Sequence, residues 1–80
     1  MSTILHVDHL PFSVTDNALE SLFSRVGQVV SCDVVLHGTT RISKAIGFVE
    51  MKSAGDARKA IAQLDGKKLD GRPIRIAEVT

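Results

Sequence analysis

Two segments of the chain, residues 15–27 and 53–66, have apolar residues at the three- and four-residue spacing of a helix with one apolar side. The stripes are Leu19, Leu22, Phe23 and Val26 in the first segment, and Ala57, Ala60, Ile61 and Leu64 in the second. Because each helix is apolar along a single stripe, the pair can cover only one face of a sheet. Any sheet in this protein is therefore expected to keep one face open.

The ends of both segments carry residues typical of helix boundaries. Thr15 and Ser53 are good N-caps, because their hydroxyl oxygens accept from backbone N–H groups that are unpaired in the first turn. Asp56 follows Ser53 by three residues, in the manner of a capping box. Gly27 and Gly66 are expected to end the helices in the left-handed conformation.

Four further segments predict strands, at residues 3–10, 29–36, 43–51 and 71–79. They are rich in β-branched residues or alternate apolar with polar residues, and residues 37–43 are the expected hairpin loop. The order β-α-β-β-α-β is that of the ferredoxin-like arrangement, an α+β fold with a four-stranded antiparallel sheet and both helices on one face. A chain of 80 residues is expected to form one domain, residues 1–80.

The expected core combines the inward-facing strand residues with the two helix stripes. The strand residues are Leu5, Val7, Val29, Cys32, Val34, Ala45, Gly47, Val49, Ile74 and Ile76. They share one face because side chains alternate along a strand. Cys32 is therefore expected to be an inert buried thiol.

The other face of the sheet has an unusual composition. The residues expected on it are Ile4, His6, Asp8, Asp33, Val35, Lys44, Ile46, Phe48, Glu50, Arg75 and Ala77. An antiparallel sheet normally carries polar residues on its solvated face, whereas here Ile46 and Phe48 are expected beside Lys44. An exposed apolar patch with cations around it indicates a binding surface.

Composition excludes several functions. The single cysteine rules out an internal disulfide and a cysteine-based zinc site. The histidines show no convergent ligand pattern; they are His6, His9 and His37. We therefore expect no bound metal, no cofactor and no catalytic residues. A net charge of +1 rules out a strongly basic wrap around duplex DNA but permits a local basic face. No apolar run approaches the roughly 20 residues of a membrane span, and the first residues lack a signal-peptide pattern. We expect a cytoplasmic protein without a membrane partner. In a eukaryote the nucleus is an alternative location.

The third strand carries a resemblance to a known family. Its sequence KAIGFVEM, residues 44–51, resembles the octapeptide K/R-G-F/Y-G/A-F-V-x-F/Y of the RNA recognition motif family. The matching positions are Lys44, Gly47, Phe48 and Val49, and the departures are Ala45, Ile46 and Met51.

The first strand extends the resemblance, which covers residues 3–79. Its sequence LHVDHL is similar to the family's hexapeptide, roughly L-[F/Y]-V-x-[N/G]-L, with matches at Leu5, Val7 and Leu10. His6 stands where the family has a stacking aromatic, and His9 where it has Asn or Gly.

The resemblance implies that the chain binds single-stranded RNA on the open face, with unpaired bases stacked on rings and phosphates paired with cations. The implied RNA-binding residues are His6, Asp8, Arg41, Lys44, Ile46, Phe48 and Arg75. Phe48 is a full stacking platform, His6 a smaller flat ring, and Ile46 offers no ring. Since a stacked base is worth about 1–3 kcal/mol, we expect weak to moderate affinity, in the micromolar range or weaker.

A different class of function uses the same face. Ile4, Val35, Ile46 and Phe48 are also suited to pack against a peptide, a helix or a second copy of the chain. The loss of aromatic residues favours this protein-interaction module, whereas Lys44, Phe48 and Arg75 favour RNA. The ferredoxin-like fold also hosts acylphosphatases and metal-transfer domains, but the chain has neither a phosphate-cradling loop after the first strand nor a CxxC pair.

Overall fold

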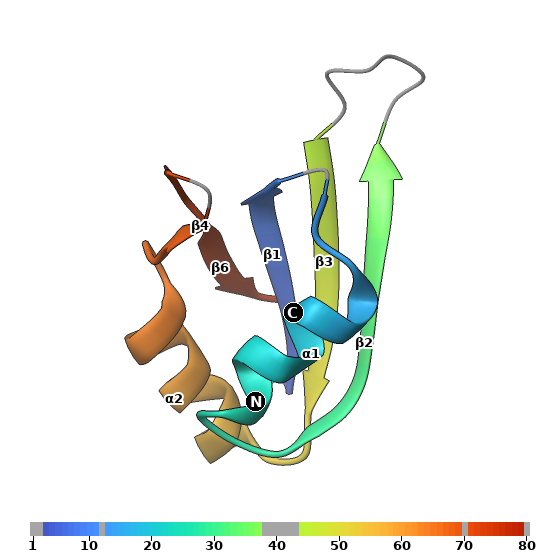
Figure 1. Ribbon diagram of the computed structural model, residues 1–80. Helices are drawn as coiled ribbons and strands as arrows, with labels where there is room; N and C mark the ends of the chain where they lie inside the picture. Colours follow the sequence, from blue (N-terminus) through green and yellow to red (C-terminus); the bar gives the residue numbers. More distant parts are fainter. Residues whose placement is uncertain (1–2, 12, 38–43, 70, 80) are drawn as a thin grey trace.

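The computed structural model describes residues 3–11, 13–37, 44–69 and 71–79, and the side chains of residues 36, 37, 44 and 45 lie outside this description. The elements are β1 (Ile4–Leu10), α1 (Asp16–Ser24), β2 (Val29–His37), β3 (Lys44–Met51), α2 (Ala54–Leu64), β4 (Lys68–Leu69), β5 (Arg72–Pro73) and β6 (Arg75–Glu78). One antiparallel sheet has the order β2-β3-β1-β6, and β4 pairs with β5 in a small hairpin. Both helices lie on the same side of the four-stranded sheet (Figure 1), so the expected ferredoxin-like fold is confirmed.

The core lies between the helices and one face of the sheet. Its buried residues are Leu5, Val7, Leu10, Leu19, Phe23, Val49, Met51, Ala57, Ala60, Leu64, Ile74 and Ile76. Leu10 was not expected there, because it is three residues from Val7 and simple alternation would turn it outward. The register of β1 against β3 shifts between Val7 and Leu10, and this bulge returns Leu10 to the core.

The helix starts agree with the sequence, but one of the expected helix ends is wrong. Thr15 Oγ1 accepts from Ala18 N at 3.2 Å, and Ser53 Oγ accepts from Asp56 N at 3.1 Å. Gly66, with a φ of 83°, follows α2 as expected, whereas α1 ends at Ser24 with a right-handed residue after it.

Gly27 has a different role from the left-handed terminator that we expected. A Cβ atom at this position would lie 2.8 Å from Asp56 Cβ and 3.0 Å from Met51 Cε. These separations are shorter than ordinary van der Waals contact. Glycine is therefore needed because the loop after α1 approaches the start of α2 closely.

The expected strand over residues 71–79 is wrong in its extent. Ile74 N donates to Lys67 O at 3.0 Å, and Gly66 N donates to Ile74 O at 2.8 Å. These bonds turn residues 72–74 back onto residues 66–69, and only Arg75–Glu78 pairs with β1. Pro73 lies where the chain changes its strand partner. Because proline has no N–H to donate, it would cost a hydrogen bond in a regular sheet.

Each edge strand of the sheet is tied to a helix by an aspartate. Asp16 Oδ1, at the start of α1, accepts from Val34 N of β2 at 2.8 Å. Asp65 Oδ1, at the end of α2, accepts from Ile76 N of β6 at 2.9 Å. Unpaired N–H groups on edge strands are sites for unwanted strand addition, and these two carboxylates occupy one such group on each edge.

Candidate nucleic-acid interface

Two rings lie side by side at the centre of the uncovered sheet face. His6 of β1 is directly opposite Phe48 of β3, and their ring centroids are 5.3 Å apart with the planes tilted by 50°. Phe48 is 41% exposed because its neighbours Gly47 and Val49 point into the core. This exposure confirms the face that alternation predicted for Phe48, and it leaves the ring free to contact a flat ligand.

The ring pair belongs to a row that crosses all four strands. Phe48 is opposite Asp33 on β2, and His6 is opposite Ala77 on β6. The row therefore begins with an exposed carboxylate at one edge, continues over two rings and ends with a small neutral side chain at the other edge.

Aliphatic residues surround the rings. Ile46, half-buried, is opposite Val35, which is 47% exposed, and Ile4 at the start of β1 is 40% exposed. These side chains provide apolar contact without a ring, so they suit the edge of a base or a sugar better than a stacked base.

Gly47 of the octapeptide is required on the covered side of the same strand. A Cβ atom there would lie 2.6 Å from Leu19 Cδ2 and 3.0 Å from Leu10 Cδ1. Glycine therefore lets α1 pack directly against β3, and this packing holds the neighbouring Phe48 on the opposite face.

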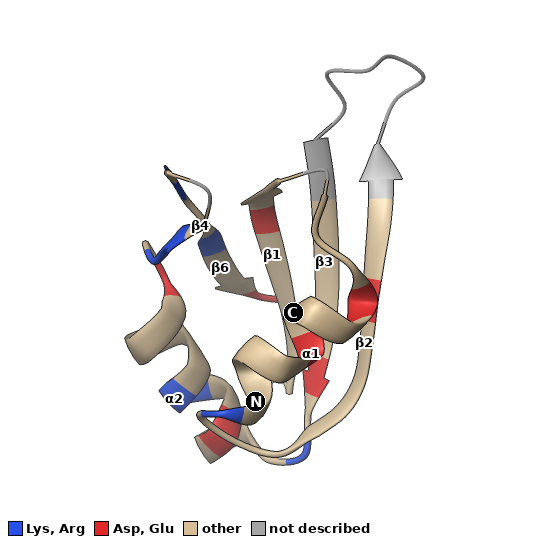
Figure 2. Cartoon of the chain, in the orientation of Figure 1, with Lys and Arg blue, Asp and Glu red and all other residues tan. Residues whose placement is uncertain are grey.

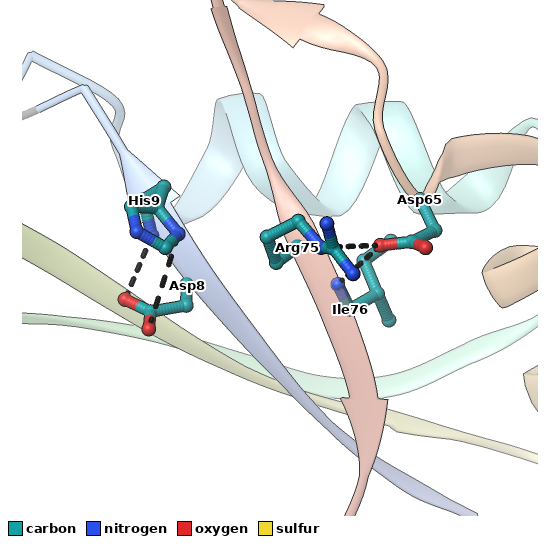
Figure 3. Close-up of polar contacts among 5 residues, drawn as sticks. All are labelled: Asp8, His9, Asp65, Arg75 and Ile76. Atoms are coloured by element: carbon teal, nitrogen blue, oxygen red, sulfur yellow. Dashed lines mark hydrogen bonds and ion pairs between the residues drawn. The ribbon is translucent and has the colours of Figure 1, made fainter.

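The bulge in β1 explains the position where the family has Asn or Gly. His9 has a φ of 64°, in the left-handed region that Gly, Asn and, less often, His adopt. Asp8 Oδ1 accepts from His9 N at 2.8 Å, and Asp8 Oδ2 is 4.0 Å from His9 Nδ1 (Figure 3). The Asp8 carboxylate therefore accepts from the backbone of the next residue and lies at the edge of the open face.

Arg75 is opposite Asp8 in the register, but its side chain reaches toward α2. Its Nε lies 3.6 Å from Oδ1 of Asp65, the same oxygen that accepts from Ile76 N (Figure 3). The side chain is 69% exposed, so it remains accessible at the β6 edge. Asp65 was not among the residues that the sequence pattern indicated for this site. Its signal is an acid at a helix C-terminus, which the helix dipole disfavours unless a partner compensates.

The charges on the open face are largely negative in the part of the chain whose side chains the structure describes. Asp8, Asp33 and Glu50 lie on this face, and Arg75 lies at its edge. Lys44 begins β3 opposite His37, and its side chain is outside the described set, as is the whole of Arg41. The structure thus brings His6, Ile46 and Phe48 together, with Asp8 and Arg75 to one side.

Cys32 lies beneath this face, half-buried at the border of the core. Its Sγ donates to Asp16 O at 3.6 Å. Burial, followed by the negative charges of Asp16, Glu20 and Asp33, raises the pKa of Cys32 from 9.0 to about 11. The side chain is therefore a neutral thiol and a poor nucleophile near neutral pH.

Other kinds of site receive less support from the described residues. Among them, no group of three or more His, Cys, Asp and Glu side chains is placed to hold a metal ion. Neither helix in this part of the chain has the length and apolar character to cross a membrane. A hollow of about 290 Å³ lies on the helix side, lined by Pro11, Val14, Ala18, Leu19, Leu22, Arg25 and Leu69. Of the described residues that line it, one is charged and none has an aromatic ring, so this lining does not match the chemistry of the open face.

Comparisons with known proteins agree with this geometry. The chloroplast 31 kDa ribonucleoprotein of Nicotiana sylvestris is 46% identical over 72 residues, which make up 90% of this chain and 23% of that protein. The crystal structure of the RNA-binding protein PG1 is 33% identical with a TM-score of 0.84, and the match covers 98% of this chain and 94% of PG1. The Sex-lethal RNA recognition domains 1 and 2 of Drosophila melanogaster match with 28% identity and a TM-score of 0.86, over 98% of this chain and 50% of theirs.

The chain spans between 23% and 31% of the length of three chloroplast ribonucleoproteins that it resembles, including the Nicotiana protein. The family comparison covers nearly all of the chain itself, because the RNA recognition motif profile matches residues 5–75. The chain belongs to the RNA recognition motif family.

Proposed function

We propose that the chain binds single-stranded RNA on the open face of the sheet, with Phe48 and His6 as the stacking pair and Ile46 in contact with a sugar or base edge. The observation that carries this proposal is the ring pair itself, in which the exposed Phe48 and the half-buried His6 lie at the centre of the face that the helices leave uncovered. Rings on a sheet stack unpaired bases without strong sequence preference. The relatives named as ribonucleoprotein and RNA-binding protein support the same ligand.

The polar residues have separate roles in this proposal. Arg41, Lys44 and Arg75 neutralise phosphates, and Asp8 accepts a hydrogen bond from a base amino group. The acidic residues of the face oppose a polyanion, and two stacking positions of the family carry His6 and Ile46 in place of phenylalanine or tyrosine. We therefore propose weak to moderate affinity, in the micromolar range or weaker.

The proposed role is to bind RNA without catalysing a reaction, in keeping with a family whose description is the RNA recognition motif. We propose that residues 1–80 act as one RNA-binding domain. We keep the cytoplasm as a proposed location, beside an organelle such as the chloroplast in which the Nicotiana relative is found.

Backbone NMR shifts during titration with a mixed pool of short single-stranded RNAs test this function. We expect the shifts to concentrate on β1, β3 and Arg75 of β6. Shifts confined to the helices, or none at millimolar RNA, would contradict it. Concentration-dependent dimerisation through the same face, without RNA shifts, would instead support the protein-interaction module.

A further inference from the structure

The row of residues that contains the rings is electrically asymmetric. Its β2 end is Asp33, an exposed carboxylate directly opposite Phe48. Its β6 end is Ala77, which is exposed, small and uncharged. Along this row, a phosphate that leaves the rings toward β2 meets the like charge of Asp33, whereas one that leaves toward β6 meets the neutral Ala77 and then Arg75, a cation that is partly balanced by Asp65.

A basic hairpin directly precedes β6 and lies at the start of that strand (Figure 1). It consists of β4 and β5 and carries the exposed cations Lys67, Lys68 and Arg72 (Figure 2). Among the described residues, none of these three side chains forms an ion pair. Asp70 lies between them in the sequence, so cations exceed carboxylates three to one in residues 67–72.

The hairpin register separates these cations by side. Lys68 is opposite Pro73, and Leu69 is opposite Arg72. Lys68 is the strand neighbour of Leu69, which packs against the core, so Lys68 points away from the core, as Arg75 does between the buried Ile74 and Ile76. Leu69 packs against the core, so Arg72 takes the opposite side from Lys68.

We propose that an RNA longer than the segment on the rings leaves the sheet over Ala77 and that its backbone is then held by Arg75 and Lys68. This inference rests on the proposed function and deepens it, since it assigns a direction across the sheet and a second contact at the basic hairpin. The ligand at this contact is the phosphodiester backbone, so the contact increases affinity and its salt dependence without reading sequence.

The test measures RNA affinity against salt concentration for a dinucleotide and for an octanucleotide of uridine. Lys68→Gln is expected to weaken octanucleotide binding about three- to fivefold near 0.1 M salt and to lower the salt slope by about 0.7. Dinucleotide binding should not change, because two nucleotides on the rings do not reach the hairpin. The matched controls are Arg72→Gln, on the other side of the hairpin, and Lys52→Gln, an exposed cation just after β3, at the end of the sheet away from the hairpin.

The possible results distinguish a failure of the hairpin contact from a failure of the proposed RNA-binding function. An octanucleotide-specific loss for Lys68→Gln that exceeds the loss for both controls supports the hairpin contact. Equal losses for Lys68→Gln and Lys52→Gln, or a loss that also appears with the dinucleotide, would overturn it, because the effect would then be a general change in net charge. If wild-type protein binds neither RNA, or Phe48→Ala binds both as well as wild type does, the proposed function fails.

Discussion

His6 and Phe48 face each other across β1 and β3, with ring centroids 5.3 Å apart and planes tilted by 50°. The tilt means that one flat base cannot lie parallel to both rings at once. Since Phe48 has the larger ring, it is the better platform, and His6 is suited to a neighbouring base or to an edge-on contact.

Replacing Phe48 with alanine should weaken RNA binding by about 1–3 kcal/mol, the range for one stacked base. The free energy of unfolding should change little, because the ring is on the open face and is 41% exposed. Fluorescence anisotropy with a short RNA and urea unfolding measure the two effects. A loss of stability of about 3–5 kcal/mol, as for truncation of a core phenylalanine, would show that the ring is part of the core.

Replacing Ile46 with tyrosine should raise RNA affinity by roughly 1 kcal/mol, because it restores a ring beside Phe48. A strand accommodates tyrosine well, and on this face its hydroxyl stays in contact with water. Anisotropy and sedimentation should be measured on the same variant. Unchanged RNA binding together with loss of a dimer or a protein partner would favour the protein-interaction module, in which a larger ring disturbs packing at a cost of about 1–3 kcal/mol.

Two glycines should respond to alanine in opposite directions. At Gly47 the new Cβ would lie 2.6 Å from Leu19 Cδ2, so Gly47→Ala should destabilise the protein by about 1–3 kcal/mol through overpacking. At Gly55 in α2 the nearest atom is Ser53 Oγ at 3.8 Å, so Gly55→Ala should stabilise by about 0.5–1 kcal/mol. Urea unfolding of both variants checks the signs, and a stable Gly47→Ala protein would refute the close packing of α1 on β3.

The periodicity of the sequence was sufficient to predict the element order and the open face, because one-sided helices and two-residue alternation leave few arrangements. It failed where a single residue departs from regular geometry. The bulge at His9 reverses the alternation and buries Leu10, and the turn of Pro73 and Ile74 onto the segment after α2 shortens the last strand. Periodicity assumes regular geometry along each strand, so it could not place either the bulge or the turn.

The residues of the binding face were predicted in outline, but the ion pair between Arg75 and Asp65 was not. Phe48, His6 and Ile46 follow from alternation alone. The contact between Arg75 and Asp65 joins a strand to a helix end ten residues away in the sequence. It depends on how α2 packs against the edge of the sheet, which is tertiary information that local patterns do not contain.

Cys32 should react slowly with iodoacetamide. Because its pKa is raised to about 11 from 9.0, the thiolate fraction at pH 8, and with it the alkylation rate, should be about 100-fold lower than for an ordinary thiol. The folded state holds this proton more tightly than the unfolded state. The resulting stability is therefore complete below about pH 9 and is lost as the pH rises through 11. Mass spectrometry of folded and urea-unfolded protein gives the rate ratio, and equal rates would contradict the raised pKa.

Replacing Asp65 with asparagine should strengthen RNA binding. The Asp65 carboxylate makes two contacts, one with Ile76 N and one with Arg75 Nε. An asparagine side-chain oxygen still accepts from Ile76 N, so the β6 edge stays attached to α2, but the negative charge beside Arg75 is lost. Since an exposed ion pair of this kind is worth about 0–1 kcal/mol, the gain in RNA affinity should be at most about fivefold, with a steeper salt dependence.

The matched variant for this prediction is Asp65→Ala, which removes both contacts. It should lower the free energy of unfolding by about 0.5–1.5 kcal/mol, the usual worth of one hydrogen bond, whereas Asp65→Asn should stay close to wild type. In the background of Arg75→Ala, Asp65→Asn should no longer change RNA affinity. If it still does, the carboxylate acts on the RNA directly by repulsion, and Arg75 is not the cation that Asp65 restrains.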